Sequence, residues 1–159
     1  MRNPAHRDPT RALAMADKSL IGRSLGTTTA EVEKGRLRFF AQAIGETNPI
    51  YTDEAAARAA GHRALPVPPT FLICLESEGR DLFEMMKILN FDLARILHAE
   101  QEFIYHQPAY AGDTLTFETK VADVYEKKGG ALQFVVNSTR VTNQQGEHIA
   151  DIRASLVQR

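Results

Sequence analysis

The residues best suited to chemistry lie in a short stretch that follows a predicted helix. Glu46 offers a carboxylate, Asn48 a side-chain amide and Tyr51 a phenol, all within a few positions. A positioned carboxylate can exchange protons with a substrate, whereas a phenol, with a reference pKa of about 10, is a weak base at neutral pH. A structural interpretation is equally open: Glu46 as a solvated loop carboxylate, Tyr51 as a packed ring, and Asn48 with Pro49 as turn formers.

A second candidate feature is a proline-rich segment that precedes an apolar run. Pro66, Pro68 and Pro69 favour an extended chain, because the residue before a proline avoids the helical region. The run FLICL at 71–75 then predicts a buried helix with Thr70 near its N-terminus. A backbone N–H at such a place can hold a developing oxyanion, and Thr70 can supply one, whereas proline cannot.

The remaining reactive side chains, histidines and one cysteine, give weaker evidence for a functional site. His98 falls at a predicted helix–strand junction and His106 in a predicted strand, where a histidine is more often structural than catalytic. The five histidines lack the paired spacing of a metal site, so the sequence predicts no metal. The single cysteine, Cys74, lies in an apolar run without a basic neighbour, so we expect an unreactive thiol.

Helical patterns precede strand patterns along the chain, and this order favours an α+β fold. Thr28 and Glu31 form a capping-box pattern that predicts a helix from Thr29 to Ile44, and residues 53–60 predict a second, short helix. Alternating apolar residues predict four strands, with Gly-containing turns between the last three, at residues 99–107, 114–126, 131–142 and 147–157. We therefore expect an antiparallel meander wrapped round one long buried helix.

Length and composition limit the possible functions. The chain has 159 residues, 43% of them hydrophobic, which suits one folded domain at 17–159 behind a flexible extension at 1–16. A net charge of −1 gives no excess of positive charge of the kind that binds nucleic acid. Neither a span of roughly 20 apolar residues nor a signal peptide is evident, so we expect a cytoplasmic protein with no membrane partner.

Three ordered segments resemble the MaoC-like hydratase/dehydratase family. Residues 40–51 are similar to its motif Gly-Asp-x-Asn-Pro-aliphatic-His, residues 66–71 to the loop that opens its central helix, and residues 105–114 to its F-x-x-P-x-x-x-G-D-T signature. The resemblance covers about residues 20–158. It implies a single hot-dog fold, in which an antiparallel sheet wraps round a central helix. It also implies a dimer that takes an acyl thioester of CoA or acyl carrier protein.

Residues 97–103 strengthen the likeness to one branch, the FAS1-like dehydratase N-terminal domain, whose members often form the acyl-binding half of a double hot-dog. The family's catalytic Asp and His are replaced here by Glu46 and Tyr51, and its His-Gly at the helix start by Pro69-Thr70. By resemblance the catalytic positions are Glu46, Tyr51 and Thr70. The predicted substrate-binding positions are Asn48, Pro49, Pro69, Phe71, His98 and His106. The resemblance implies no cofactor and no metal.

Three functions follow from this pattern, of which the sequence slightly favours the first and ranks the third last. The first is reversible hydration of a trans-2-enoyl thioester, within fatty acid metabolism, by a homodimer. The second is a non-catalytic acyl-binding subunit that pairs with a second hot-dog chain, since both His-containing motif positions have changed. The third is a thioesterase on the same fold. In each, the methionine-rich segment 84–89 either fills the core or forms a wall for the acyl chain.

Overall fold

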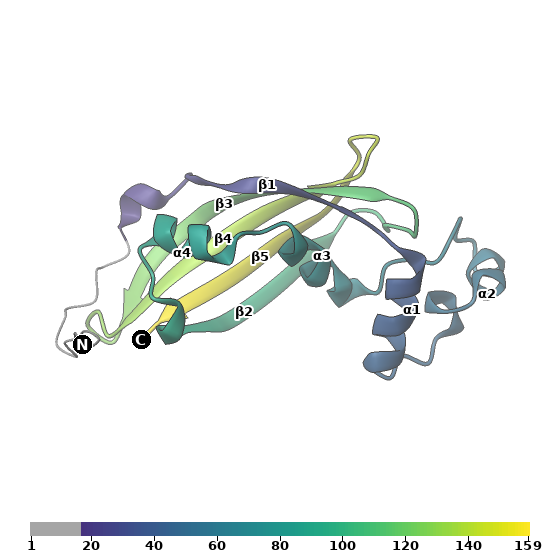
Figure 1. Ribbon diagram of the computed structural model, residues 1–159, viewed down its shortest axis with the longest axis horizontal. Helices are drawn as coiled ribbons and strands as arrows, with labels where there is room; N and C mark the ends of the chain where they lie inside the picture. The colour runs from purple at the N-terminus through teal and green to yellow at the C-terminus, as the bar shows by residue number, and fades with distance from the viewer. Residues whose placement is uncertain (1–16) are drawn as a thin grey trace, which may run out of the picture.

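A five-stranded sheet and four α-helices make up the computed structural model, which describes residues 17–159 (Figure 1). The predicted extension at 1–16 lies outside the described residues. The strands are β1 (Ser24–Glu31), β2 (Ile96–Tyr105), β3 (Thr114–Lys127), β4 (Leu132–Thr142) and β5 (His148–Gln158). The α-helices are α1 (Lys34–Ala43), α2 (Glu54–Ala59), α3 (Leu72–Glu78) and α4 (Leu82–Leu89). Short 3-10 helices are η1 (Lys18–Leu20), η2 (Pro49–Tyr51), η3 (Pro69–Phe71) and η4 (Leu93–Arg95).

All neighbouring strands are antiparallel, in the order β1-β3-β4-β5-β2. The predicted meander is right for β3, β4 and β5, which follow one another as hairpins. It is wrong for β2, which pairs with β5 rather than β3 and so forms the edge opposite β1. The alternation of apolar residues locates a strand, but it does not say which neighbour the strand pairs with.

The start of the predicted first helix is also wrong. Residues 24–31 form β1, where Thr28 pairs with Phe117 of β3, and the helix begins only at Lys34. The three consecutive threonines at 27–29 explain the error, because β-branched side chains favour the extended chain. The Thr28–Glu31 pattern therefore lies within a strand and caps no helix.

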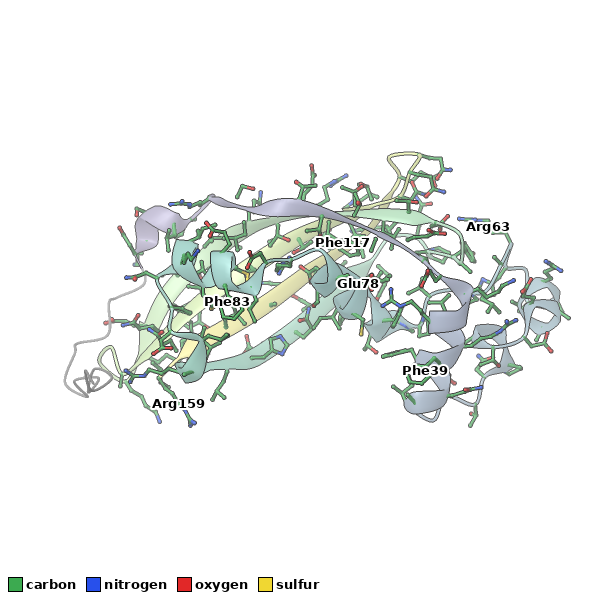
Figure 2. The ribbon with its side chains drawn as sticks, in the orientation of Figure 1. Phe39, Arg63, Glu78, Phe83, Phe117 and Arg159 are labelled. Atoms are coloured by element: carbon green, nitrogen blue, oxygen red, sulfur yellow. The ribbon has the colours of Figure 1, made fainter. Side chains whose placement is uncertain are left out.

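The core lies between the sheet and α3, as the prediction of a sheet wrapped round a buried helix requires (Figure 1). Leu72 and Leu75 of α3 are fully buried, and they belong to the same apolar cluster as Phe117 of β3 and Leu37 of α1. Figure 2 labels Phe117 on the sheet beside the helices. The predicted central helix is short, because Gly79 ends α3 and Asp81 begins α4.

The methionine-rich segment forms α4 and packs into a second apolar cluster. Met85, Met86 and Leu89 are buried there against β3 and β4, whereas Phe83 on the other side of the helix is exposed (Figure 2). These methionines therefore fill the core of the domain. None of the described helices is long and apolar enough to cross a membrane.

The cap of α4 gives a first prediction. The Asp81 carboxylate accepts a hydrogen bond from the backbone N–H of Glu84 at 3.0 Å, and so satisfies a donor that the helix leaves free. Replacing Asp81 with alanine should lower the free energy of unfolding by about 1 kcal/mol, measured by urea denaturation. Asp81→Ser keeps a capping oxygen and is the control. Equal losses in the two variants would contradict the capping role.

Candidate active site

The segment between α1 and α2 is a series of turns held by its own side chains. Gly45 ends the helix with a φ of 72°, a left-handed conformation that glycine adopts without strain. The Glu46 carboxylate accepts a hydrogen bond from the N–H of Asn48 at 2.8 Å, and the Asn48 side chain accepts one from the N–H of Ile50 at 3.2 Å. Glu46 and Asn48 thus shape the turn that leads into η2 and presents Tyr51.

A cavity of about 310 Å³ lies where η2, the proline-rich loop and the end of β2 converge. Its lining is largely apolar or aromatic: Ile50, Tyr51, His62, Pro66, Val67, Pro69, Leu72, Tyr105, His106, Gln107, Pro108 and Ala109. Three predicted site residues, Tyr51, Pro69 and His106, are therefore brought together from separate parts of the chain. The cavity lies at the start of α3, the place that the sequence indicated.

The other predicted site residues lie outside this lining. Asn48 and Pro49 belong to the turn before Tyr51, and Thr70 is exposed on η3. Phe71 is buried against Phe40, with ring centroids 4.8 Å apart. His98 is exposed on β2 and shares a hydrogen bond with Gln101.

Among the nine lining residues that were not predicted as site residues are His62 and Tyr105, which carry groups that can form hydrogen bonds. Tyr105 is the first residue of the motif at 105–114, which could have identified it. His62 gives no signal in the sequence, and its Nδ1 lies 3.3 Å from the hydroxyl of Tyr110. Its place in the site is a consequence of tertiary folding.

One buried carboxylate fixes the rim of the cavity. Asp113 is fully buried and accepts hydrogen bonds from Arg63 at 2.5 Å, from the backbone N–H of Tyr110 at 2.8 Å and from Gln144 at 3.2 Å. Across the loop, the Val67 N–H donates to the Ala109 carbonyl at 2.9 Å. Asp113 of the third motif therefore holds the loop that carries four of the lining residues, His106, Gln107, Pro108 and Ala109.

The two phenols of the cavity resist ionisation. Burial raises the pKa of Tyr51, and the nearby negative charge of Glu46 raises it further. Burial raises the pKa of Tyr105 to about 12, with a smaller contribution from Tyr51. Both groups are therefore protonated near neutral pH and can donate hydrogen bonds, but neither is a ready base.

This shift predicts the pH dependence of stability. The unfolded chain begins to lose the Tyr105 proton near pH 10, whereas the folded chain holds it up to about pH 12. The stabilisation is therefore complete below pH 10 and is lost as the pH rises through 12. Between pH 10 and pH 12, the free energy of unfolding measured by denaturation should fall less for Tyr105→Phe than for the wild type. Phenolate absorbance should show that this variant lacks the last phenol to ionise, and an unchanged titration would contradict the assignment.

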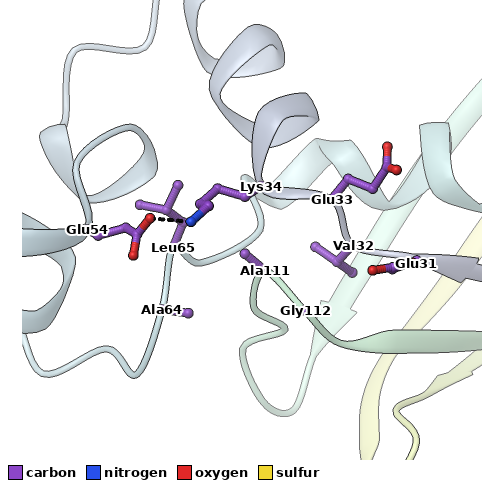
Figure 3. A pocket seen from close by; sticks show the side chains of 9 residues that line it. All are labelled: Glu31, Val32, Glu33, Lys34, Glu54, Ala64, Leu65, Ala111 and Gly112. Atoms are coloured by element: carbon purple, nitrogen blue, oxygen red, sulfur yellow. Dashed lines mark hydrogen bonds and ion pairs between the residues drawn. The ribbon is translucent and has the colours of Figure 1, made fainter.

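A second cavity, of about 390 Å³, is lined by residues from the start of α1, from α2 and from two loops (Figure 3). Its charged groups are Glu31, Glu33, Lys34 and Glu54, and the Lys34 ammonium already pairs with Glu54 at 2.6 Å. Three carboxylates and one ammonium give this cavity a negative character, which disfavours an anionic ligand such as the CoA thioester that the resemblance implies. The first cavity is therefore the better candidate site.

Two histidines that are remote in sequence meet one carboxylate beside β2. Nε2 of His106 lies 2.8 Å from one oxygen of Asp151, and Nε2 of His148 lies 3.0 Å from the other. The two imidazole centroids are 4.1 Å apart. Burial opposes ionisation of Asp151, but the two histidine hydrogen bonds outweigh it and lower the pKa of the carboxyl group. The separation of the histidines in the sequence explains why no pairing was predicted.

The curved antiparallel sheet round α3, with a cavity at the helix start, defines a hot-dog domain. Similar solved structures include the HadBC (3R-hydroxyacyl-ACP dehydratase) complex of Mycobacterium tuberculosis, with a TM-score of 0.74 and 24% identity over 89% of this chain and 98% of that one. The ChsH1–ChsH2 complex of the same organism has a TM-score of 0.71 and 24% identity, covering 89% and 90% of the two chains. These likenesses confirm the predicted fold.

The sequence comparisons identify the family. The profile described as "FAS1-like, dehydratase domain region" matches residues 19–152. The UPF0336 protein of Saccharopolyspora erythraea is 35% identical over 144 residues, which are 90% of this chain and 91% of that protein. The chain belongs to the FAS1-like dehydratase family, and the predicted resemblance to MaoC-like hydratases is confirmed.

Proposed function

We propose that this protein is the acyl-binding subunit of a hot-dog hydratase/dehydratase that acts on enoyl and 3-hydroxyacyl thioesters. The observation that carries the proposal is the lining of the first cavity. Among the described residues, the lining includes no carboxylate, and its phenols at Tyr51 and Tyr105 are protonated. The two imidazoles of the lining, His62 and His106, already share hydrogen bonds with Tyr110 and Asp151. Such a cavity therefore suits an apolar acyl chain with a hydrogen-bonded carbonyl better than it suits the removal of a proton from water.

The position of Glu46 supports the same function. Its carboxylate accepts the N–H of Asn48 and does not line the cavity. Pro69 lines the cavity, but it has no N–H to offer an oxyanion. The residues at the family's catalytic positions are therefore better suited to shaping the cavity than to acid–base chemistry.

The exposed edge strand β2 supports assembly with a second hot-dog chain. Leu97 and Ile104 are about half exposed along a ten-residue edge, and an uncovered apolar edge invites pairing with another strand. The similar HadBC and ChsH1–ChsH2 structures are each complexes of two named components. We infer that a partner chain pairs along β2 and supplies the catalytic Asp and His.

A second candidate function is catalysis by this chain itself as a homodimer. Glu46 raises the pKa of Tyr51 through its charge, so the two groups are close enough to interact, and His62 and His106 line the same cavity. A water molecule held between these groups would then be the reactant. In this candidate, Glu46 would act beside a cavity lined by two imidazoles, in place of the family's usual pair.

Hydration assays separate the two candidates. The purified chain alone should bind a non-hydrolysable acyl-CoA analogue and leave the enoyl absorbance of short and medium 2-enoyl-CoA substrates unchanged. Hydration should appear once a hot-dog chain that retains the family's Asp and His is co-purified with it. Hydration by the chain alone, abolished in Glu46→Gln, would overturn the subunit proposal and establish the second candidate. Release of free thiol from acyl-CoA would instead reveal a thioesterase.

A further inference from the structure

The cluster at the end of β2 has the composition of a metal site. His106 directly follows β2, while His148 and Asp151 lie on β5, so the cluster bridges two paired strands. One ligand atom from each of the three residues can be chosen so that all lie within 4.8 Å of one another. Two imidazoles and one carboxylate are a common donor set for zinc and for other divalent first-row metals.

The distances require little movement to accept an ion. Each histidine Nε2 already lies within 3.0 Å of an Asp151 oxygen. Ligand bonds of about 2.0–2.2 Å set neighbouring ligand atoms around one zinc ion about 3–4 Å apart. The side chains of His106 and Asp151 are 39% and 40% exposed, so small rotations can open space between them at little cost in packing.

We infer that His106, His148 and Asp151 form a binding site for a divalent transition metal ion, with Zn²⁺ as the best match. Three protein ligands leave a fourth tetrahedral position open to water or to another donor. An ion held here would add a side-chain link between the end of β2 and β5, beside the backbone hydrogen bonds from His106 and Gln107 to the Ile149 carbonyl. Because His106 also lines the first cavity, the ion would fix the backbone at that cavity's rim.

Zinc titration of the full chain tests this inference independently of any enzymatic activity. The protein is prepared without a histidine tag, treated with a chelator and titrated with Zn²⁺ alone in a calorimeter. We expect one ion per chain, with a dissociation constant of about 1 µM or tighter. Co²⁺ in place of Zn²⁺ should give the intense visible absorption of a tetrahedral site.

Substitutions then locate the site. His148→Ala and Asp151→Asn should each weaken zinc binding by about tenfold or more, because each removes a donor. His98→Ala is the matched control, since His98 is also exposed on β2 but lies outside the cluster. Circular dichroism checks that each variant is folded. If His148→Ala does not fold, zinc binding by Asp151→Asn decides whether the cluster is the site. Absence of stoichiometric binding in the wild type, or an equal loss in His98→Ala, would overturn the inference and leave a hydrogen-bonded trio without an ion.

Discussion

Replacing Glu76 with alanine should lower the free energy of unfolding by about 3–5 kcal/mol. Glu76 projects from α3 towards the sheet and is only 5% exposed. Its carboxylate accepts hydrogen bonds from Thr139 at 2.6 Å and from Arg80 at 2.6 Å, and Arg80 also donates to Thr119 at 2.6 Å. Removing the carboxylate would leave a largely buried guanidinium without its counter-charge, and this costs far more than the lost hydrogen bonds alone.

Two further variants separate charge from packing. Glu76→Gln keeps the shape and one acceptor, so its loss of stability should be smaller than that of Glu76→Ala. The double variant Glu76→Leu/Arg80→Leu removes both charges together, and apolar replacement of a buried ion pair is often neutral or stabilising. It should therefore recover much of the stability in urea denaturation followed by circular dichroism. A loss below about 1 kcal/mol in Glu76→Ala would show that the pair is effectively solvated.

The sequence predicted well those helices and strands whose ends or faces are determined by residues close together in the chain. The sequence offers Thr52 or Asp53 as the cap of α2, and the Asp53 carboxylate takes this role by accepting hydrogen bonds from the N–H groups of Ala55 and Ala56. The alternation in β3 reflects one face packed against the helices, whereas residues 133–137 of β4 are all buried. By contrast, β1 and the pairing of β2 with β5 depend on contacts between distant segments. Glu76 likewise ends the run FLICLE at 71–76, where nothing in the sequence indicates a buried carboxylate.

Only part of the candidate site could be predicted, because some of its contacts also join distant segments of the chain. The motifs identified three lining residues, Tyr51, Pro69 and His106, because each motif has a fixed place in the fold. They did not show that the Glu46 carboxylate is bonded to its own turn, since a motif specifies residue types and not side-chain orientation. His62 joins the cavity through its contact with Tyr110, a partner 48 positions away. The catalytic and binding roles assigned from the resemblance are still predictions.

The double variant Leu97→Lys/Ile104→Lys should weaken assembly through β2 by about 10- to 100-fold. The two residues pair with Val157 and Asp151, which lie on the same face of β5, so both side chains emerge from one face of the edge strand. They are 47% and 51% exposed in the single chain. Burying the exposed half of each side chain would contribute about 0.7–1.5 kcal/mol, and each 1.4 kcal/mol corresponds to a tenfold change in affinity. Lysines there would remove this term and add charge to the strand edge, a device that prevents pairing.

Sedimentation velocity across a concentration series measures the effect, both for the chain alone and for its co-purified complex. Ile21→Lys is the matched control, because Ile21 is 46% exposed but lies outside β2. Assembly that survives in the double variant would contradict pairing along β2, even if the chain still binds acyl-CoA. Assembly lost together with hydration, while binding of an acyl-CoA analogue by the single chain persists, would place the missing catalytic groups on the partner. This combination separates a subunit that shapes the cavity from an enzyme that is complete in itself, because a self-sufficient active site would not need the partner's residues to turn over substrate.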